Sequence, residues 1–110
     1  MNQIKTSTIV ELKKFIDDKT FKKIFIIAGN QSYNLSGLKK FFLTIKNKNI
    51  KFFFKVRPYP EYSELMQITK NIELFSPDLI IAAGGGSVMD YAKIANVINP
   101  NSSLVENIKN

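Results

Sequence analysis

Residues 77–98 read PDLIIAAGGGSVMDYAKIANVI, and this stretch decides the fold. Its first part, Leu79 to Ala83, is an uninterrupted apolar run between a proline and three glycines, a pattern typical of a parallel strand buried on both faces. After Ser87, apolar residues recur at the spacing of a helix, namely Val88, Ala92, Ala95 and Ile98. The stretch therefore predicts a strand, a glycine turn and the start of a helix.

The three glycines of this turn, Gly84, Gly85 and Gly86, indicate an anion-binding backbone. The first N–H groups of a helix have no partner inside it, and they point outward at the positive end of the helix dipole. Because glycine has no Cβ, a phosphate or pyrophosphate can approach that backbone closely. A purely structural interpretation stands beside this one. Ser87 and Asp90 would form a variant capping box, Asp90 would also pair with Lys93, and the glycines would allow close packing.

The order Pro-Asp-Leu-Ile-Ile-Ala-x-Gly-Gly-Gly-Ser-x-x-Asp-x-Ala-Lys resembles the signature of the iron-containing (group III) alcohol dehydrogenases. Their superfamily also contains glycerol dehydrogenases and dehydroquinate synthases. Lys93 favours the dehydrogenase branch, because a glycine would be expected at this position in the synthases. The resemblance implies that Gly85, Gly86 and Ser87 line the pyrophosphate of NAD or NADP, and that Asp90 braces the loop.

A second apolar run, Ile24 to Ala28, predicts another buried parallel strand, which ends at Gly29-Asn30. An acid beyond such a strand holds the adenosine ribose and repels a 2′-phosphate. In the family that this chain resembles, an Asp near this place favours NAD. Gly29-Asn30 offers no carboxylate and resembles the Gly-Lys-x-Ser variants, which is compatible with binding of NADP. Alternatively, Gly29 only closes a turn. The candidate cofactor-binding residues are Gly29, Asn30, Gly84, Gly85, Gly86, Ser87 and Asp90, and no catalytic residue is expected.

Three more helices are predicted over residues 7–18, 36–48 and 62–75, and one more strand over residues 51–56. The phenylalanines of that strand are expected in the core, as are Leu65, Met66, Ile68, Ile72 and Phe75 of the third helix. The turn at residues 99–103 is predicted to end the ordered pattern.

The alternation of strands and helices predicts an α/β fold, with a Rossmann-like parallel sheet flanked by helices and with ligands at the carboxyl ends of its strands. The resemblance implies the amino-terminal half of a dehydroquinate synthase-like or iron-containing alcohol dehydrogenase fold. Residues 56–60 are similar to the Val-x-Pro-Asn-Pro segment of that family, whose Asn lies near the cofactor. Tyr59 stands in place of this Asn, so the role is not carried over.

The chain contains no cysteine and no histidine. A cytoplasmic, reducing compartment is compatible with the first absence. Catalytic zinc and iron sites draw on imidazole ligands, so no metal site is predicted in this chain. The net charge of +7 is concentrated in residues 1–57, but the lysines are dispersed there. We therefore expect a field that mildly favours an anionic dinucleotide, and no nucleic-acid partner. No apolar run approaches the roughly 18 residues that span a bilayer, so no membrane partner is expected.

Residues 1–110 are expected to form a single NAD(P)-binding α/β domain. The resemblance implies that the metal-binding helical domain, which would hold iron or zinc, is absent. The chain would then be a truncated product or a piece of a longer protein, cut near residues 99–101. The parent enzyme would transfer hydride between NAD(P)H and a small alcohol or aldehyde, and the isolated chain would be inactive. A homodimer is compatible with this reading. The alternatives are a stand-alone nucleotide-binding or interaction module, and a phosphotransferase whose Gly-Gly-Asp-Gly turn is not matched here.

Overall fold

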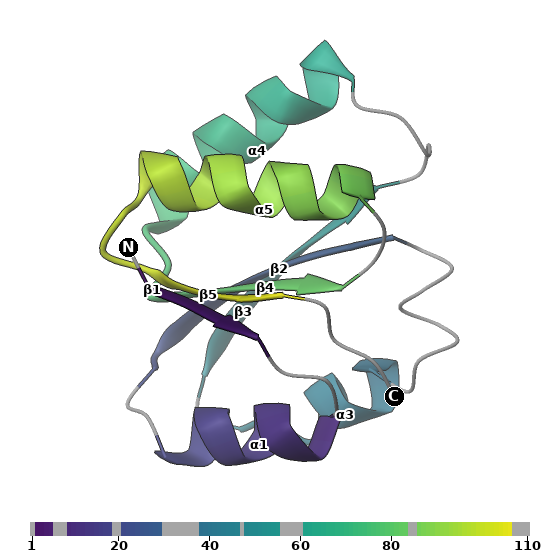
Figure 1. The fold of residues 1–110 in the computed structure, drawn as a ribbon, viewed down its shortest axis with the longest axis vertical. Coiled ribbons are helices and arrows are strands. Elements are labelled where there is room, and N and C mark those ends of the chain that lie inside the picture. The colour runs from purple at the N-terminus through teal and green to yellow at the C-terminus, as the bar shows by residue number, and fades with distance from the viewer. Residues whose placement is uncertain are drawn as a thin grey trace.

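A computed structural model describes residues 2–5, 9–18, 21–29, 38–46, 48–55, 61–83 and 86–106. Strands and helices alternate along these residues (Figure 1). The strands are β1 (Asn2–Lys5), β2 (Lys23–Gly29), β3 (Asn49–Lys55), β4 (Leu79–Ala83) and β5 (Ser103–Glu106). The helices are α1 (Ile9–Asp18), α3 (Leu38–Leu43), α4 (Tyr62–Phe75) and α5 (Gly86–Ile98).

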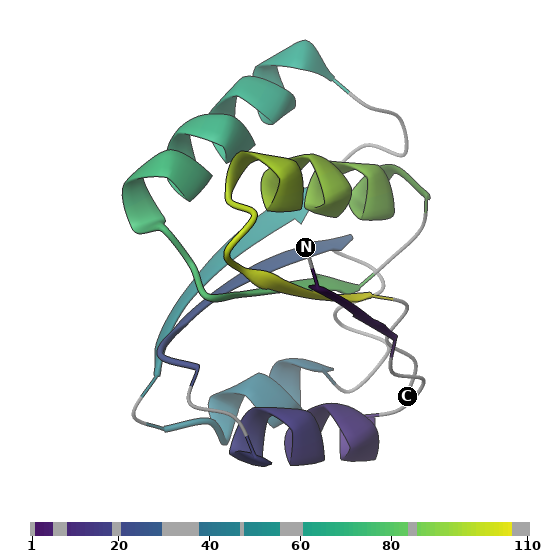
Figure 2. The ribbon, with the colours of Figure 1, turned by 60° about the vertical axis from the view of Figure 1, so that its left-hand side comes forward.

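The strands form one sheet in the order β1-β5-β4-β2-β3. Every neighbouring pair in this sheet is parallel. The sheet lies between two layers of helices, α1 and α3 on one face and α4 and α5 on the other (Figures 1 and 2). The prediction of a Rossmann-like parallel sheet flanked by helices is therefore confirmed.

Strands β2 and β4 are apolar on both faces, because a helix layer covers each side of the sheet. Ile24, Ile26 and Ala28 pack toward α1 and α3, whereas Phe25 and Ile27 pack toward α4 and α5. Each of these five side chains is completely buried. The uninterrupted apolar runs of the sequence thus reflect burial on two sides, as predicted.

Two strands escaped prediction. The ordered pattern does not end at residues 99–103, because β5 follows and pairs with both β4 and β1. Only two of its residues, Leu104 and Val105, are buried apolar side chains, which is too short a run to stand out from a turn. Strand β1 has a single large apolar residue, Ile4, and lies at the edge of the sheet.

The helix predicted over residues 36–48 is shorter, because α3 ends at Leu43. The next two backbone N–H groups, of Thr44 and Ile45, bond three residues back to the carbonyls of Phe41 and Phe42. The Thr44 hydroxyl also donates to the Phe41 carbonyl at 2.6 Å. This side-chain bond competes with helix continuation, and the chain turns into β3 at Asn49.

Two predictions about core residues were wrong. Phe52 and Phe54 are each 38% exposed, because β3 is an edge strand; their rings stack on one another at 5.6 Å. Met66 is 52% exposed on the outer side of α4, whereas Ile68 and Ile72 are fully buried as predicted. The bounds of α4 and β4 agree with the prediction.

The amino edge of the sheet is held together by Asp78, just before β4. Its carboxylate accepts hydrogen bonds from the backbone N–H groups of Lys22, at 3.0 Å, and Lys23, at 3.1 Å. The Asp78 backbone N–H donates to the Lys23 carbonyl, and its own carbonyl accepts from Ser103 N–H. Asp78 therefore joins the starts of β2, β4 and β5.

A buried amide closes the turn between α5 and β5. Asn96 is fully buried, and its Nδ2 donates to the Ser102 carbonyl at 2.8 Å and to the Ser102 hydroxyl oxygen at 3.1 Å. The Ser102 hydroxyl in turn donates to the Asn99 carbonyl. These contacts fix the end of α5 at the amino edge. The start of α5 therefore lies at the opposite, carboxyl edge. No helix in the described part of the chain is long and apolar enough to cross a bilayer.

Candidate functional site

The two glycine-containing turns begin side by side at the carboxyl edge of the sheet. Strands β2 and β4 are neighbours, and Ala28 pairs in register with Ala83. Gly29 continues β2 by one residue, and residue 84 follows Ala83. Because neighbouring strands lie about 4.8 Å apart, the chain leaves the sheet at two adjacent points.

The chain runs from these two strand ends to opposite faces of the sheet. After β2 it leads to α3, whose Phe41 and Phe42 pack in the cluster with Ile26. After β4 it leads to α5, whose Val88 and Ala92 pack in the other cluster. Adjacent parallel strands with such divergent connections form a crevice, and open α/β sheets bind their ligands at this place. Figures 1 and 2 show α3 and α5 on the two sides of the sheet.

Helix α5 has its amino end at the carboxyl edge of the sheet, where β4 ends. It begins at Gly86, extends over 13 residues and has no acidic residue in its first turn. No carboxylate in that turn therefore neutralises the positive end of the helix dipole or accepts hydrogen bonds from the first N–H groups. The helix bounds place Ser87 in the first turn of α5, and the capping role considered for Ser87 stays a prediction. The arrangement suits an anionic group.

The structure describes four of the seven candidate residues. Gly29 ends β2, Gly86 and Ser87 open α5, and Asp90 follows one turn later. Gly29 and the start of α5 thus lie on the same edge. The others, Asn30, Gly84 and Gly85, lie outside the described residues.

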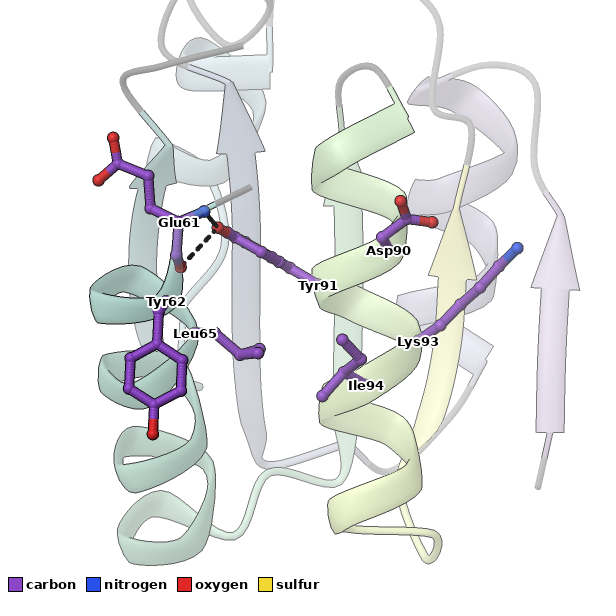
Figure 3. A pocket seen from close by; sticks show the side chains of 7 residues that line it. All are labelled: Glu61, Tyr62, Leu65, Asp90, Tyr91, Lys93 and Ile94. Atoms are coloured by element: carbon purple, nitrogen blue, oxygen red, sulfur yellow. Dashed lines mark hydrogen bonds between the residues drawn. The ribbon is translucent and has the colours of Figure 1, made fainter. Parts of the chain in front are cut away.

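Asp90 lies on the exposed surface of α5 and is one of the residues that line a groove beside α4 and α5; its carboxylate points away from α4 (Figure 3). It forms no ion pair with Lys93 in the described structure, which removes one part of the structural alternative. The brace that Asp90 was expected to provide for the glycine turn stays a prediction. The groove has a volume of about 500 Å³ and a mainly apolar lining, which includes Tyr62, Leu65 and Ile94.

Tyr91 is the residue near this edge that the sequence did not reveal. Its side chain is 2% exposed and crosses from α5 to the start of α4. The hydroxyl accepts a hydrogen bond from Glu61 N–H at 2.7 Å and lies 3.0 Å from Glu64 Oε1. Its helical spacing from Val88 and Ala95 could have placed it on the buried face, but no local pattern links it to a residue 30 positions away.

No group of three or more acids, histidines or cysteines in the described residues could hold a metal ion. The complete sequence has no histidine and no cysteine. The residues present do not fit an iron or zinc site, which draws on imidazole and thiolate ligands.

Comparison with known proteins agrees with this geometry. The family model of iron-containing alcohol dehydrogenases matches residues 3–110. Aldehyde-alcohol dehydrogenase 2 of Entamoeba histolytica is 35% identical over 80 residues, which are 69% of this chain and 9% of that protein.

Solved structures show the same fold. An iron-containing alcohol dehydrogenase from Corynebacterium glutamicum superposes with a TM-score of 0.70 at 18% identity, over 96% of this chain and 29% of that one. An iron-containing alcohol dehydrogenase from Thermotoga maritima gives 0.67 at 25% identity, over 91% of this chain and 29% of that one. This chain thus spans less than a third of each relative, and it belongs to the iron-containing alcohol dehydrogenase family.

Proposed function

We propose that residues 1–110 form the NAD(P)-binding α/β domain of a metal-dependent alcohol dehydrogenase. One observation carries the proposal: Ala28 and Ala83 are paired in register on adjacent strands, and the chain then leaves for opposite faces of the sheet. A dinucleotide has two halves joined by a pyrophosphate, and such a crevice can accommodate one half on each side of the switch.

The residues of this chain would bind and orient the cofactor. In our proposal the turn at Gly84, Gly85, Gly86 and Ser87 donates backbone N–H groups to the pyrophosphate, and Asp90 braces the turn. Gly29 and Asn30 would lie beside the adenosine ribose at the end of β2. When bound, NAD(P)H supplies the hydride.

The activity of the whole protein is also a proposal. Hydride transfer between NAD(P)H and a small alcohol or aldehyde is supported by family membership and by the relative named aldehyde-alcohol dehydrogenase. Iron or zinc would have to be held by residues outside this chain, because the ligands it requires are not among those present.

A second candidate is a nucleotide-binding or interaction module without catalysis, favoured by the absence of histidine and cysteine from the sequence. Titration of the 110-residue chain with NADH, NADPH and ATP, followed by cofactor fluorescence and thermal shift, separates the candidates. Our proposal predicts saturable binding of NADH or NADPH in preference to ATP. A preference for ATP would contradict the dehydrogenase proposal, and binding of none of the three would exclude a dinucleotide site in this chain.

Gly29→Asp is expected to lower the affinity for NADPH about fivefold relative to that for NADH. A carboxylate at the end of β2 would repel the 2′-phosphate and accept hydrogen bonds from the 2′-hydroxyl; fivefold corresponds to about 1 kcal/mol. Gly29→Asn is the matched control, because it has the same shape without the charge. If the ratio of the NADPH and NADH dissociation constants were the same for the two variants, the ribose would not bind at this strand end.

A further inference from the structure

The two helices on one face of the sheet both begin at its carboxyl edge. Helix α4 follows β3 and begins at Tyr62, and α5 follows β4 and begins at Gly86. Both preceding strands are parallel members of the same sheet. The two helices pack on one another through a shared cluster of buried side chains, which includes Ile68 and Ala92. Because the two helices pack together, a shift of one helix start is expected to affect the other.

The N-cap residue of α4 does not cap the helix with its own side chain. Glu61 occupies the N-cap position, with extended backbone angles, and its side chain makes no capping hydrogen bond. In a capping box, the carboxylate three residues later would accept a hydrogen bond from the N-cap N–H. Glu64 is at that third position, but here a hydroxyl from another helix is interposed.

That hydroxyl belongs to Tyr91, and it lies between the Glu61 N–H and the Glu64 carboxylate. Glu61 N–H donates to the Tyr91 oxygen at 2.7 Å, and the Tyr91 O–H lies 3.2 Å from the Glu61 carbonyl (Figure 3). The same O–H lies 3.0 Å from Glu64 Oε1. One side chain of α5 thus completes the amino-terminal cap of α4. The ring itself is buried in the cluster between the helices, so its packing and its hydroxyl contacts can be separated by mutation.

We propose that Tyr91 is a positioning residue for the dinucleotide site: its hydroxyl holds the first turn of α4 against α5 and so fixes the two helix starts at the carboxyl edge. This inference rests on the proposed function. Tyr91 is placed on α5 five residues after Gly86, so it acts through the backbone that it holds. Loss of the hydroxyl would release the start of α4 and loosen the first turn of α5, where the pyrophosphate is proposed to bind.

The test is Tyr91→Phe in the full 110-residue chain, with dissociation constants for NADH and NADPH measured by fluorescence and amide hydrogen exchange measured in the free protein. Removal of one buried hydrogen-bonding group should weaken binding about fivefold. Amide exchange should accelerate in the first turn of α4 and also in the first turn of α5. The ring remains, so the variant should keep the native far-UV spectrum.

Tyr62→Phe is the matched control. It removes the same atom from a side chain that is 78% exposed and that points away from the Tyr91 hydroxyl (Figure 3). Neither affinity nor exchange should change. Glu64→Ala removes one of the two acceptors of the Tyr91 hydroxyl and leaves Tyr91 intact, so it should weaken binding about threefold, in the same direction as the loss of the hydroxyl. Glu64→Gln still accepts a hydrogen bond and should restore most of the affinity.

If Tyr91→Phe accelerated amide exchange in α4 alone and left the cofactor affinity unchanged, Tyr91 would only cap α4, and the inference would be overturned. An equal effect of Tyr62→Phe would also overturn it. If the unmodified chain bound neither dinucleotide, the proposed function would fail separately. In that case the exchange rates in the first turn of α5 would still decide whether Tyr91 links the two helix starts.

Discussion

Gly86→Asp is expected to weaken binding of both NADH and NADPH about thirtyfold while the protein stays folded. An aspartate in the first turn of a helix interacts favourably with the helix dipole, so α5 itself should tolerate the change. The same carboxylate would face the proposed pyrophosphate. Repulsion of about 2 kcal/mol is reasonable for charges roughly 8 Å apart at an effective dielectric constant near 20, and it corresponds to about thirtyfold.

The control for this prediction is Asn101→Asp. It adds the same charge in the exposed turn between α5 and β5, at the opposite edge of the sheet. Fluorescence titration of both variants should show a loss of affinity for Gly86→Asp alone. Equal affinities for Gly86→Asp and the unmodified chain would mean that no phosphate approaches the start of α5.

Asp78→Ala is expected to lower the free energy of unfolding by about 2 kcal/mol and the melting temperature by about 10 °C. The carboxylate accepts backbone hydrogen bonds from Lys22 and Lys23, and these bonds tie the start of β2 to the start of β4. Without the carboxylate, the backbone N–H groups of Lys22 and Lys23 lose these hydrogen bonds. Urea denaturation followed by circular dichroism measures the change.

Asp17→Ala provides the comparison for the stability measurement. It also removes a carboxylate, but one from an ion pair with Lys13 on the surface of α1, where both side chains are about 60% exposed. Such pairs contribute less than about 1 kcal/mol. If the two alanine variants unfolded at the same urea concentration, Asp78 would not hold the amino edge together.

The sequence predicted those elements whose signals are local. An uninterrupted apolar run between a proline and the glycines set the bounds of β4, and strong helical periodicity set those of α4. Family resemblance and the glycine turn together located the edge of the sheet at which to look for a ligand. The family itself was confirmed by a match over residues 3–110.

Elements that depend on distant parts of the chain were not predictable in the same way. Strand β5 has two buried apolar residues and exists because β4 and β1 supply hydrogen-bonding partners on both sides. The exposure of Phe52 and Phe54 follows from the edge position of β3, which only the strand order reveals. The contact between Tyr91 and Glu61 likewise requires that α4 and α5 lie side by side.

The register of β2 and β4 is the feature that the sequence could not provide and on which the site depends. Each strand was recognisable alone, but their adjacency and the pairing of Ala28 with Ala83 come from the sheet order. Without that pairing, Gly29 and the glycine turn would be two unrelated loops. With it, the ends of β2 and β4, from which the two turns depart, lie next to one another.

An NMR titration of the ¹⁵N-labelled chain with NADPH, repeated with inorganic pyrophosphate, tests the central claim most directly. We predict that the largest amide shifts occur at Gly84, Gly85, Gly86 and Ser87 with both ligands, and that shifts at Gly29 and Asn30 occur with NADPH alone. Largest shifts in the groove between α4 and α5, at Leu65 and Ile94, with unchanged glycine amides, would contradict the assignment of the pyrophosphate to the start of α5.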